Sequence, residues 1–166
     1  TSSTLFEKNQ KIKRIYGNSL IQGHKILDKK LIEDDENYHL FATHNGYEKK
    51  FGYLHKRSMK ILKKENKIYG IDEFEKTKNI SNFTYYFIRF HVYPGIKIVK
   101  TKGKNSVLIR QPNGEGWILQ SNTNNIDIEN NIFLARKKII NNECICIKGS
   151  INETKISINW EIEKLK

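Results

Sequence analysis

The chain has 166 residues, of which 37% are hydrophobic, and a formal net charge of +12. This length and apolar content are sufficient for one domain with a buried core and exclude a disordered chain. No run approaches about 18 consecutive apolar residues, so the sequence predicts neither a transmembrane helix nor membrane insertion. Thr1 stands first, and the opening TSSTLFEKNQ lacks the apolar centre of a signal peptide. We therefore expect residues 1–166 to be a single domain and a piece of a longer chain.

The positive charge is spread along the chain. Lysines are interrupted by acidic residues, as in KKLIEDDE and KRSMKILKKENK. This pattern favours a solvated, lysine-rich surface, and a sulfated or carboxylated polysaccharide is the next partner to consider. The sequence has no zinc-finger spacing and no RNP-like aromatic run. A nucleic-acid binder therefore has only the net charge in its favour, and we expect no nucleic-acid partner.

Short runs of Ile, Val, Phe, Tyr and Thr between Gly and Asn turns predict an all-β chain. We expect strands near 24–32, 38–43, 50–62, 67–74, 86–93, 96–100, 107–109, 117–119, 126–134, 139–148 and 153–164. EDDEN at 33–37 is expected to be a loop tip, and Asn113-Gly114 the turn of a hairpin. Turns recur every 8–12 residues or so, roughly the spacing of an antiparallel β-sandwich of about ten to twelve short strands.

Two of these strands alternate clearly between an apolar and a polar face. The last strand places on one face Thr154, Ile156, Ile158, Trp160 and Ile162. The run YFIRFHVYPG (86–95) has a core face of Tyr86, Ile88, Phe90 and Val92, and an opposite face of Phe87, Arg89, His91 and Tyr93. Arg, His and Tyr side chains bind sugars and carboxylates well. This second face is either a binding surface or an ordinary polar face covered by another element.

The segment THNGYEKKFGYLHKRSMKI predicts a second face of this kind. A turn at Asn45-Gly46 precedes a strand in which one face holds Phe51, Tyr53, His55, Arg57 and Met59. If this strand and 86–93 belong to one sheet, His55, Arg57, Arg89 and His91 form a shared cationic and aromatic surface suited to an acidic polysaccharide. The alternative is that Arg57 pairs with an acid such as Asp72 while His55 bonds a backbone carbonyl.

Metal-binding and catalytic patterns are weak in this chain. The five histidines form neither H-x-H nor H-E-x-x-H, and G-x-S-x-G is absent. Cys144 and Cys146 form an isolated C-x-C, for which buried thiols in a strand are a better explanation than a metal site or a disulfide. We expect no metal and no cofactor in this segment, and we assign no catalytic residue.

Taken together, the order HNGY, FGYLHKRSMKI, IYGIDEF, FIRFHVYPG, SVLIRQPNGEGWIL and ISINWEIEK resembles the C-terminal β domain of heparinase II/III-like proteins. The resemblance covers nearly the whole chain and is most specific over 44–120. TSSTLF resembles the stretch that follows the family's zinc-proximal strands. The resemblance implies an antiparallel β-sandwich packed on an upstream helical toroid, and β-elimination on polysaccharides that contain uronic acid.

The resemblance also implies where the chemistry lies. The family's main Asn, His and Tyr catalytic groups lie largely in the toroid, and its metal ligands in the first strands of the β domain; residues 1–166 match neither. Tyr93 stands where many relatives have a second His, so His91 is expected to be a structural strand end that borders the cleft. We expect His55, Arg57, Arg89 and His91 to be candidate cleft residues, a metal ion only upstream, and a cell-envelope or periplasmic location. The alternative is a non-catalytic carbohydrate-binding or structural module.

Overall fold

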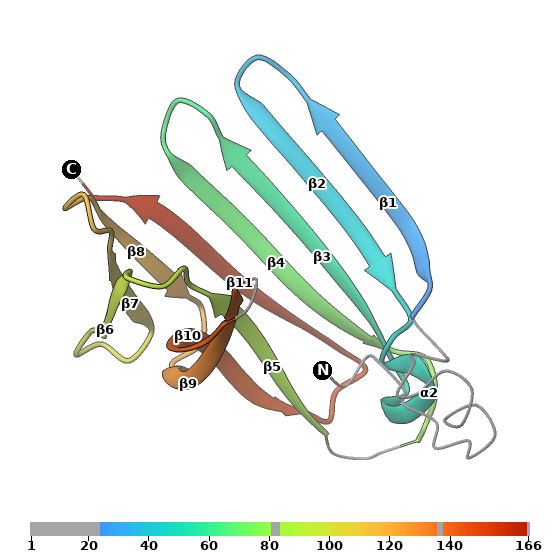
Figure 1. The fold of residues 1–166 in the computed structure, drawn as a ribbon. Coiled ribbons are helices and arrows are strands. Elements are labelled where there is room, and N and C mark those ends of the chain that lie inside the picture. Colours follow the sequence, from blue (N-terminus) through green and yellow to red (C-terminus); the bar gives the residue numbers. More distant parts are fainter. Residues whose placement is uncertain (1–23, 81–83, 136–137, 166) are drawn as a thin grey trace.

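The computed structural model describes residues 24–80, 84–135 and 138–165, and these residues form an all-β sandwich. The TSSTLF segment lies outside them. The elements are β1 Ile26–Glu33, β2 Asn37–His44, α2 Glu48–Phe51, β3 Tyr53–Leu62, β4 Lys67–Lys76, β5 Thr84–His91, β6 Lys97–Lys100, β7 Ser106–Arg110, β8 Gly116–Ser121, β9 Ile126–Ala135, β10 Lys138–Ile151 and β11 Lys155–Lys164 (Figure 1). Within the described residues, no helix is both long and apolar enough to span a membrane.

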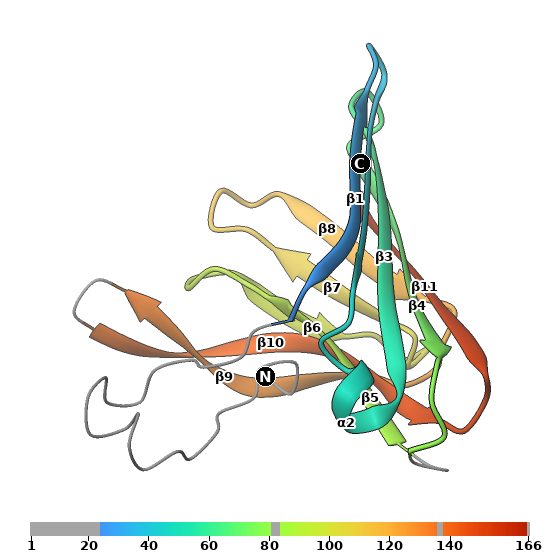
Figure 2. The same ribbon diagram turned by 90° about the vertical axis from the view of Figure 1, so that its right-hand side faces the viewer.

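The strands form two antiparallel sheets. The large sheet has eight strands in the order β1-β2-β3-β4-β11-β8-β7-β6, and the small sheet has three in the order β5-β10-β9. Strand β11 joins the two parts of the large sheet, because it pairs with β4 on one side and with β8 on the other. Figure 2 shows the β1–β4 part of the large sheet nearly edge-on, and the β1–β2 tip extends well past the small sheet.

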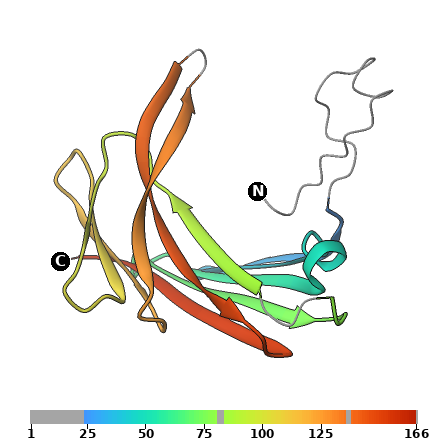
Figure 3. The same cartoon turned by 90° about the horizontal axis from the view of Figure 1, so that it is seen from below.

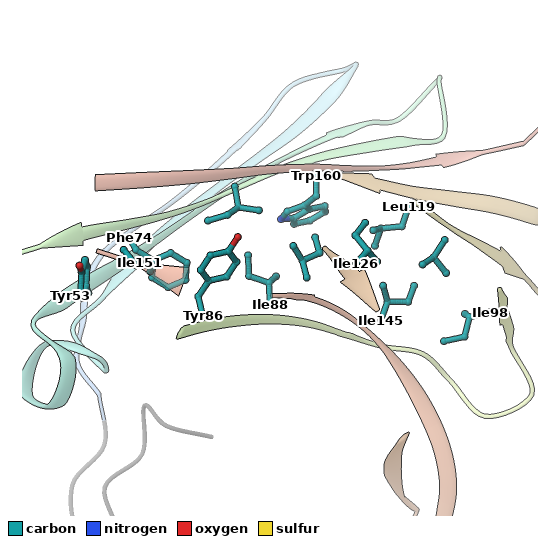
Figure 4. Packing of buried hydrophobic residues seen from close by; sticks show 13 residues of the cluster. Tyr53, Phe74, Tyr86, Ile88, Ile98, Leu119, Ile126, Ile145, Ile151 and Trp160 are labelled. Atoms are coloured by element: carbon teal, nitrogen blue, oxygen red, sulfur yellow. The ribbon is translucent and has the colours of Figure 1, made fainter. Parts of the chain in front are cut away.

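The core lies between the two sheets. Side chains from both sheets point toward each other there, among them Trp160, Leu119, Ile88, Ile126 and Ile145 (Figure 4). Among the described residues, β1 and β2 contribute none to this buried cluster, and every residue of β1 is exposed. The view from below shows the same asymmetry, with β1 and β2 beyond the edge of the small sheet (Figure 3). The sandwich is therefore closed over β4, β11 and β8 and open over β1 and β2.

Two turns between neighbouring strands form where the sequence predicts them. The Asp34 carboxylate accepts backbone N–H groups of Glu36 and Asn37 at 2.8 and 2.6 Å, which closes the β1–β2 tip. Gly114 has a positive φ of 91° in the β7–β8 turn. The predictions of a tip at 33–37 and a hairpin at Asn113-Gly114 are confirmed.

One boundary differs from the prediction. The strand expected from residue 50 begins at Tyr53, because residues 48–51 form the single-turn helix α2. Gly52 ends that helix with a φ of 79°, a left-handed conformation that an L side chain rarely adopts. Phe51 consequently lies on α2, while Tyr53, His55, Arg57 and Met59 share the predicted face of β3.

Candidate functional site

A fully buried carboxylate, that of Asp72 on β4, organises the polar interior of the large sheet. Its Oδ1 accepts hydrogen bonds from His55 Nε2 at 2.6 Å and Arg57 Nε at 2.7 Å, and its Oδ2 from Arg57 Nη2 at 3.0 Å and Trp160 Nε1 at 2.8 Å. A carboxylate removed from water is tolerated only with such partners. We call Asp72, Arg57, His55, His44 and Trp160 the Asp72 network.

Strand register brings these residues together. Arg57 on β3 lies directly opposite Asp72 on β4, and Trp160 on β11 lies opposite Gly70, two residues before Asp72. A Cβ at Gly70 would lie 2.0 Å from the Trp160 ring. Gly70 therefore leaves the space in which the indole lies across β4 and donates to Asp72.

The hydrogen bonds also assign the histidine tautomers. The Gly46 backbone N–H donates to His44 Nδ1 at 3.1 Å, so the ring proton of a neutral His44 lies on Nε2. His44 Nε2 lies 2.9 Å from His55 Nδ1 and donates to it. The His55 proton then lies on Nε2, where it is donated to Asp72. The three hydrogen bonds therefore donate in the same direction, from the Gly46 N–H through His44 and His55 to the Asp72 carboxylate.

Burial and charge keep this arrangement in one protonation state. Burial, followed by the neighbouring His55, His24 and Arg57, lowers the pKa of His44 to about 4. Burial alone would raise the pKa of Asp72, but hydrogen bonds from His55 and Arg57 and the Arg57 charge outweigh it and lower that pKa. At neutral pH the network thus holds a neutral His44 and an ionised Asp72.

Arg57 is the member that this network presents outward. Both ring nitrogens of His44 and of His55 are engaged in hydrogen bonds, and the Phe74 ring stacks on His55 with centroids 4.8 Å apart. The Arg57 side chain is 38% exposed, against 11% for His55. The predicted pairing of Arg57 with Asp72 is confirmed, whereas His55 bonds Asp72 and His44 instead of a backbone carbonyl. The network can orient a guanidinium but presents no free base.

Arg89 and His91 lie elsewhere, on the face of the small sheet that points away from the core. Arg89 Nε and Nη2 donate to Glu129 at 3.2 and 3.0 Å, and its guanidinium lies over the Phe87 ring at 4.9 Å. Asn131 Nδ2 donates to His91 Nδ1 at 2.6 Å. Because β3 and β5 belong to different sheets, the four candidate residues form two separate groups rather than one surface.

Two thiols lie beneath the second group. Cys144 and Cys146 of β10 are free and buried, as the sequence predicts. Burial raises the pKa of Cys146 to about 11, so this sulfur is a protonated, unreactive group at neutral pH. Their small side chains fill the centre of this face under the Arg89–Glu129 pair.

A pocket of about 430 Å³ lies between α2 and the beginning of β5, and we call it the β5 pocket. Its lining is mainly aromatic: Tyr47, Phe51, Tyr53, Phe74, Tyr85, Tyr86 and Phe87, with Thr84, Arg89 and Ile151. Phe74 separates it from the Asp72 network, because this ring stacks on His55 on one side and on Tyr86 on the other, at 4.8 and 5.7 Å. Of the four candidate residues, Arg89 alone lines this pocket.

Sequence reasoning missed His44, Trp160 and Phe74 as site residues. The turn at Asn45-Gly46 was a usable signal for His44, since a connection there places His44 opposite His55 on neighbouring strands. Within the described part of the chain, no three His, Cys, Asp or Glu side chains gather in a way that could hold a metal ion.

Comparison with known proteins identifies the family. The family model described as "Heparinase II/III-like, C-terminal" matches residues 1–161, and no curated protein matches the chain. Among solved structures, the heparan sulfate lyase HepC from Pedobacter heparinus aligns with a TM-score of 0.71 at 14% identity, over 90% of this chain and 23% of that one. The heparinase III BT4657 gene product aligns with a TM-score of 0.65 at 12% identity, over 90% of this chain and 22% of that one.

These alignments agree with the two-sheet fold, and the chain spans less than a quarter of either neighbour's length. The family model covers nearly all of this chain. The chain therefore belongs to the heparinase II/III-like family, in which it corresponds to the C-terminal domain.

Proposed function

We propose that the full-length protein is a polysaccharide lyase that cleaves uronic-acid-containing polysaccharide by β-elimination, and that this domain supports an upstream helical toroid. Family membership over residues 1–161 is the observation that carries the proposal. Solved neighbours described as a heparan sulfate lyase and a heparinase III support it, and about three quarters of their length lies outside the aligned domain. Most catalytic groups, and any metal ion, would then lie in that remaining part.

The open side of the sandwich fits a supporting role. On the inner face of β1–β3, a hollow of about 560 Å³ is lined by Leu31, Leu40 and Met59 together with Lys29 and Arg57. Leu31 is 63% exposed and the adjacent Ile26 is 59% exposed. Apolar surface of this kind commonly marks a contact with another domain. We assign the toroid to this face.

The chemistry gives separate roles to the candidate residues. β-Elimination requires that a uronate carboxylate be neutralised while a base removes the C5 proton and an acid protonates the leaving oxygen. Arg57 can pair with a carboxylate at the edge of the domain, and His55 acts behind it as a positioning residue through Asp72. Arg89 and His91 lie on the other sheet and contact substrate only where the cleft extends to β5. We propose a location in the cell envelope or periplasm, because extracellular polysaccharide is broken down there.

The test incubates the full-length protein with heparan sulfate, hyaluronan or alginate. Cleavage is measured by the ultraviolet absorbance of the unsaturated uronate product. We expect product from the full-length protein and none from residues 1–166 alone. Formation of product by residues 1–166 alone would show that the catalytic groups lie in this domain. If the full-length protein binds these uronate polymers but cleaves none of them, the hypothesis of a non-catalytic carbohydrate module replaces that of a lyase.

A further inference from the structure

We propose that the β5 pocket binds one uronate unit of an acidic oligosaccharide, at a subsite separate from the Asp72 network. The choice of ligand class rests on the proposed function. The location rests on the pocket's shape, its aromatic walls and the cations at two of its rings.

The pocket has the size and position of a ligand site. Its volume of about 430 Å³ falls in the usual range for small-molecule sites, roughly 300–1,000 Å³. Four consecutive residues of β5, 84–87, line it, although their side chains alternate between the two faces of the strand. The pocket therefore meets the edge of β5. Among the described strands, β5 pairs only with β10, so this edge offers backbone N–H and C=O groups to sugar hydroxyls.

Aromatic rings form the walls, and some of them are open to solvent. Tyr85 is 66% exposed and Phe87 is 48% exposed, while Tyr86 and Phe74 are buried at the base. The apolar C–H face of a pyranose packs against such rings. An exposed aromatic wall over a buried aromatic base fits a sugar subsite.

A cationic side chain lies over each of two rings that line the pocket. The Lys50 ammonium lies 5.2 Å from the centre of the Phe51 ring, and the Arg89 guanidinium 4.9 Å from that of Phe87. Both rings line the pocket, one from α2 and the other from β5. A carboxylate bound between the rings would meet positive charge from either element, and the net charge of +12 favours approach of a polyanion. A purely apolar occupant would use neither cation.

Charge and aromatic surface together therefore select an anionic sugar. Arg89 is held in place by Glu129, so the guanidinium is already oriented before the ligand binds. Lys50 is exposed on α2 and is free to be substituted without affecting the core. These two residues and Phe87 provide the variants for a test.

The experiment uses the full-length protein and an unsaturated heparan sulfate disaccharide, which a lyase does not cleave further, with lactose as the neutral probe. Titration calorimetry gives the Kd for wild type, Phe87→Ala, Lys50→Gln and Tyr69→Ala. Tyr69 is a matched control, because it is a 39% exposed ring with Lys67 at 4.8 Å on the opposite face of the large sheet. We expect Phe87→Ala and Lys50→Gln each to weaken binding by about tenfold, Tyr69→Ala to leave it unchanged, and lactose not to bind.

Equal affinity in all four proteins would overturn the proposal, as would equal binding of lactose. If the full-length protein cleaves polymer while Phe87→Ala and Lys50→Gln bind the disaccharide like wild type, the proposed function stands and the subsite fails. If these variants lose disaccharide binding in a protein that cleaves no polymer, the subsite stands and the lyase assignment fails.

Discussion

Replacing Asp72 by Asn tests whether the buried carboxylate stabilises the domain. The carboxylate accepts four hydrogen bonds, and an amide offers only one acceptor oxygen, with its NH₂ group turned toward donors. Removing one partner of a buried ion pair costs about 3–5 kcal/mol. Because the Arg57 side chain is 38% exposed, water can solvate it in part, so we expect the lower end, about 3 kcal/mol.

The assay is urea unfolding followed by tryptophan fluorescence, with Glu73→Gln as the matched control. Glu73 is the next residue on β4 and points to the other face, where it pairs with Lys155 at 2.8 Å and Lys56 at 3.5 Å. These pairs are solvated, so this control should lose less than about 1 kcal/mol. If Asp72→Asn costs no more than Glu73→Gln, the network does not stabilise the fold and the reasoning fails.

Three further predictions follow from the same geometry. His44 has a pKa of about 4 in the folded protein against 6.5 ordinarily, so below pH 6.5 the unfolded chain binds more protons than the folded one. The free energy of unfolding therefore has its full value above pH 6.5 and falls by about 1–2 kcal/mol toward pH 4. Urea titrations across this pH range should show a smaller fall for His44→Gln. Gly70→Ala forces Trp160 to move and lowers the melting temperature. Gly103→Ala is the control and should change it little, because its φ is not in the left-handed region and its added Cβ first meets the Asn105 side-chain oxygen, at 3.1 Å. Cys144 and Cys146 resist a thiol reagent until denaturant unfolds the protein; fast labelling of the folded protein would contradict their burial.

Strand positions could be predicted because their signal is local. Side chains of a half-buried strand alternate, and β11 shows this with Ile156, Ile158 and Trp160 on its inner face. The single helical turn at α2 was missed because four residues carry no helical period. The division of β3 and β5 between two sheets depends on pairing between distant segments, which no local pattern records. For that reason the condition for a shared surface of His55, Arg57, Arg89 and His91, that both strands belong to one sheet, is not met, and these residues form two groups.

The Asp72 network was beyond local prediction for a further physical reason, which also explains its position. His44, His55, Asp72 and Trp160 come from β2, β3, β4 and β11, so the network connects four neighbouring strands of the large sheet. Among the described residues, β2 adds nothing to the apolar core, while its pairing with β3 and the hydrogen bond of His44 to His55 connect it to the closed part of the sandwich. The Asp72 network thus lies at the border between the closed and open regions, where the small sheet no longer provides apolar packing. Its hydrogen bonds fix the register of the strands that carry the proposed toroid contact.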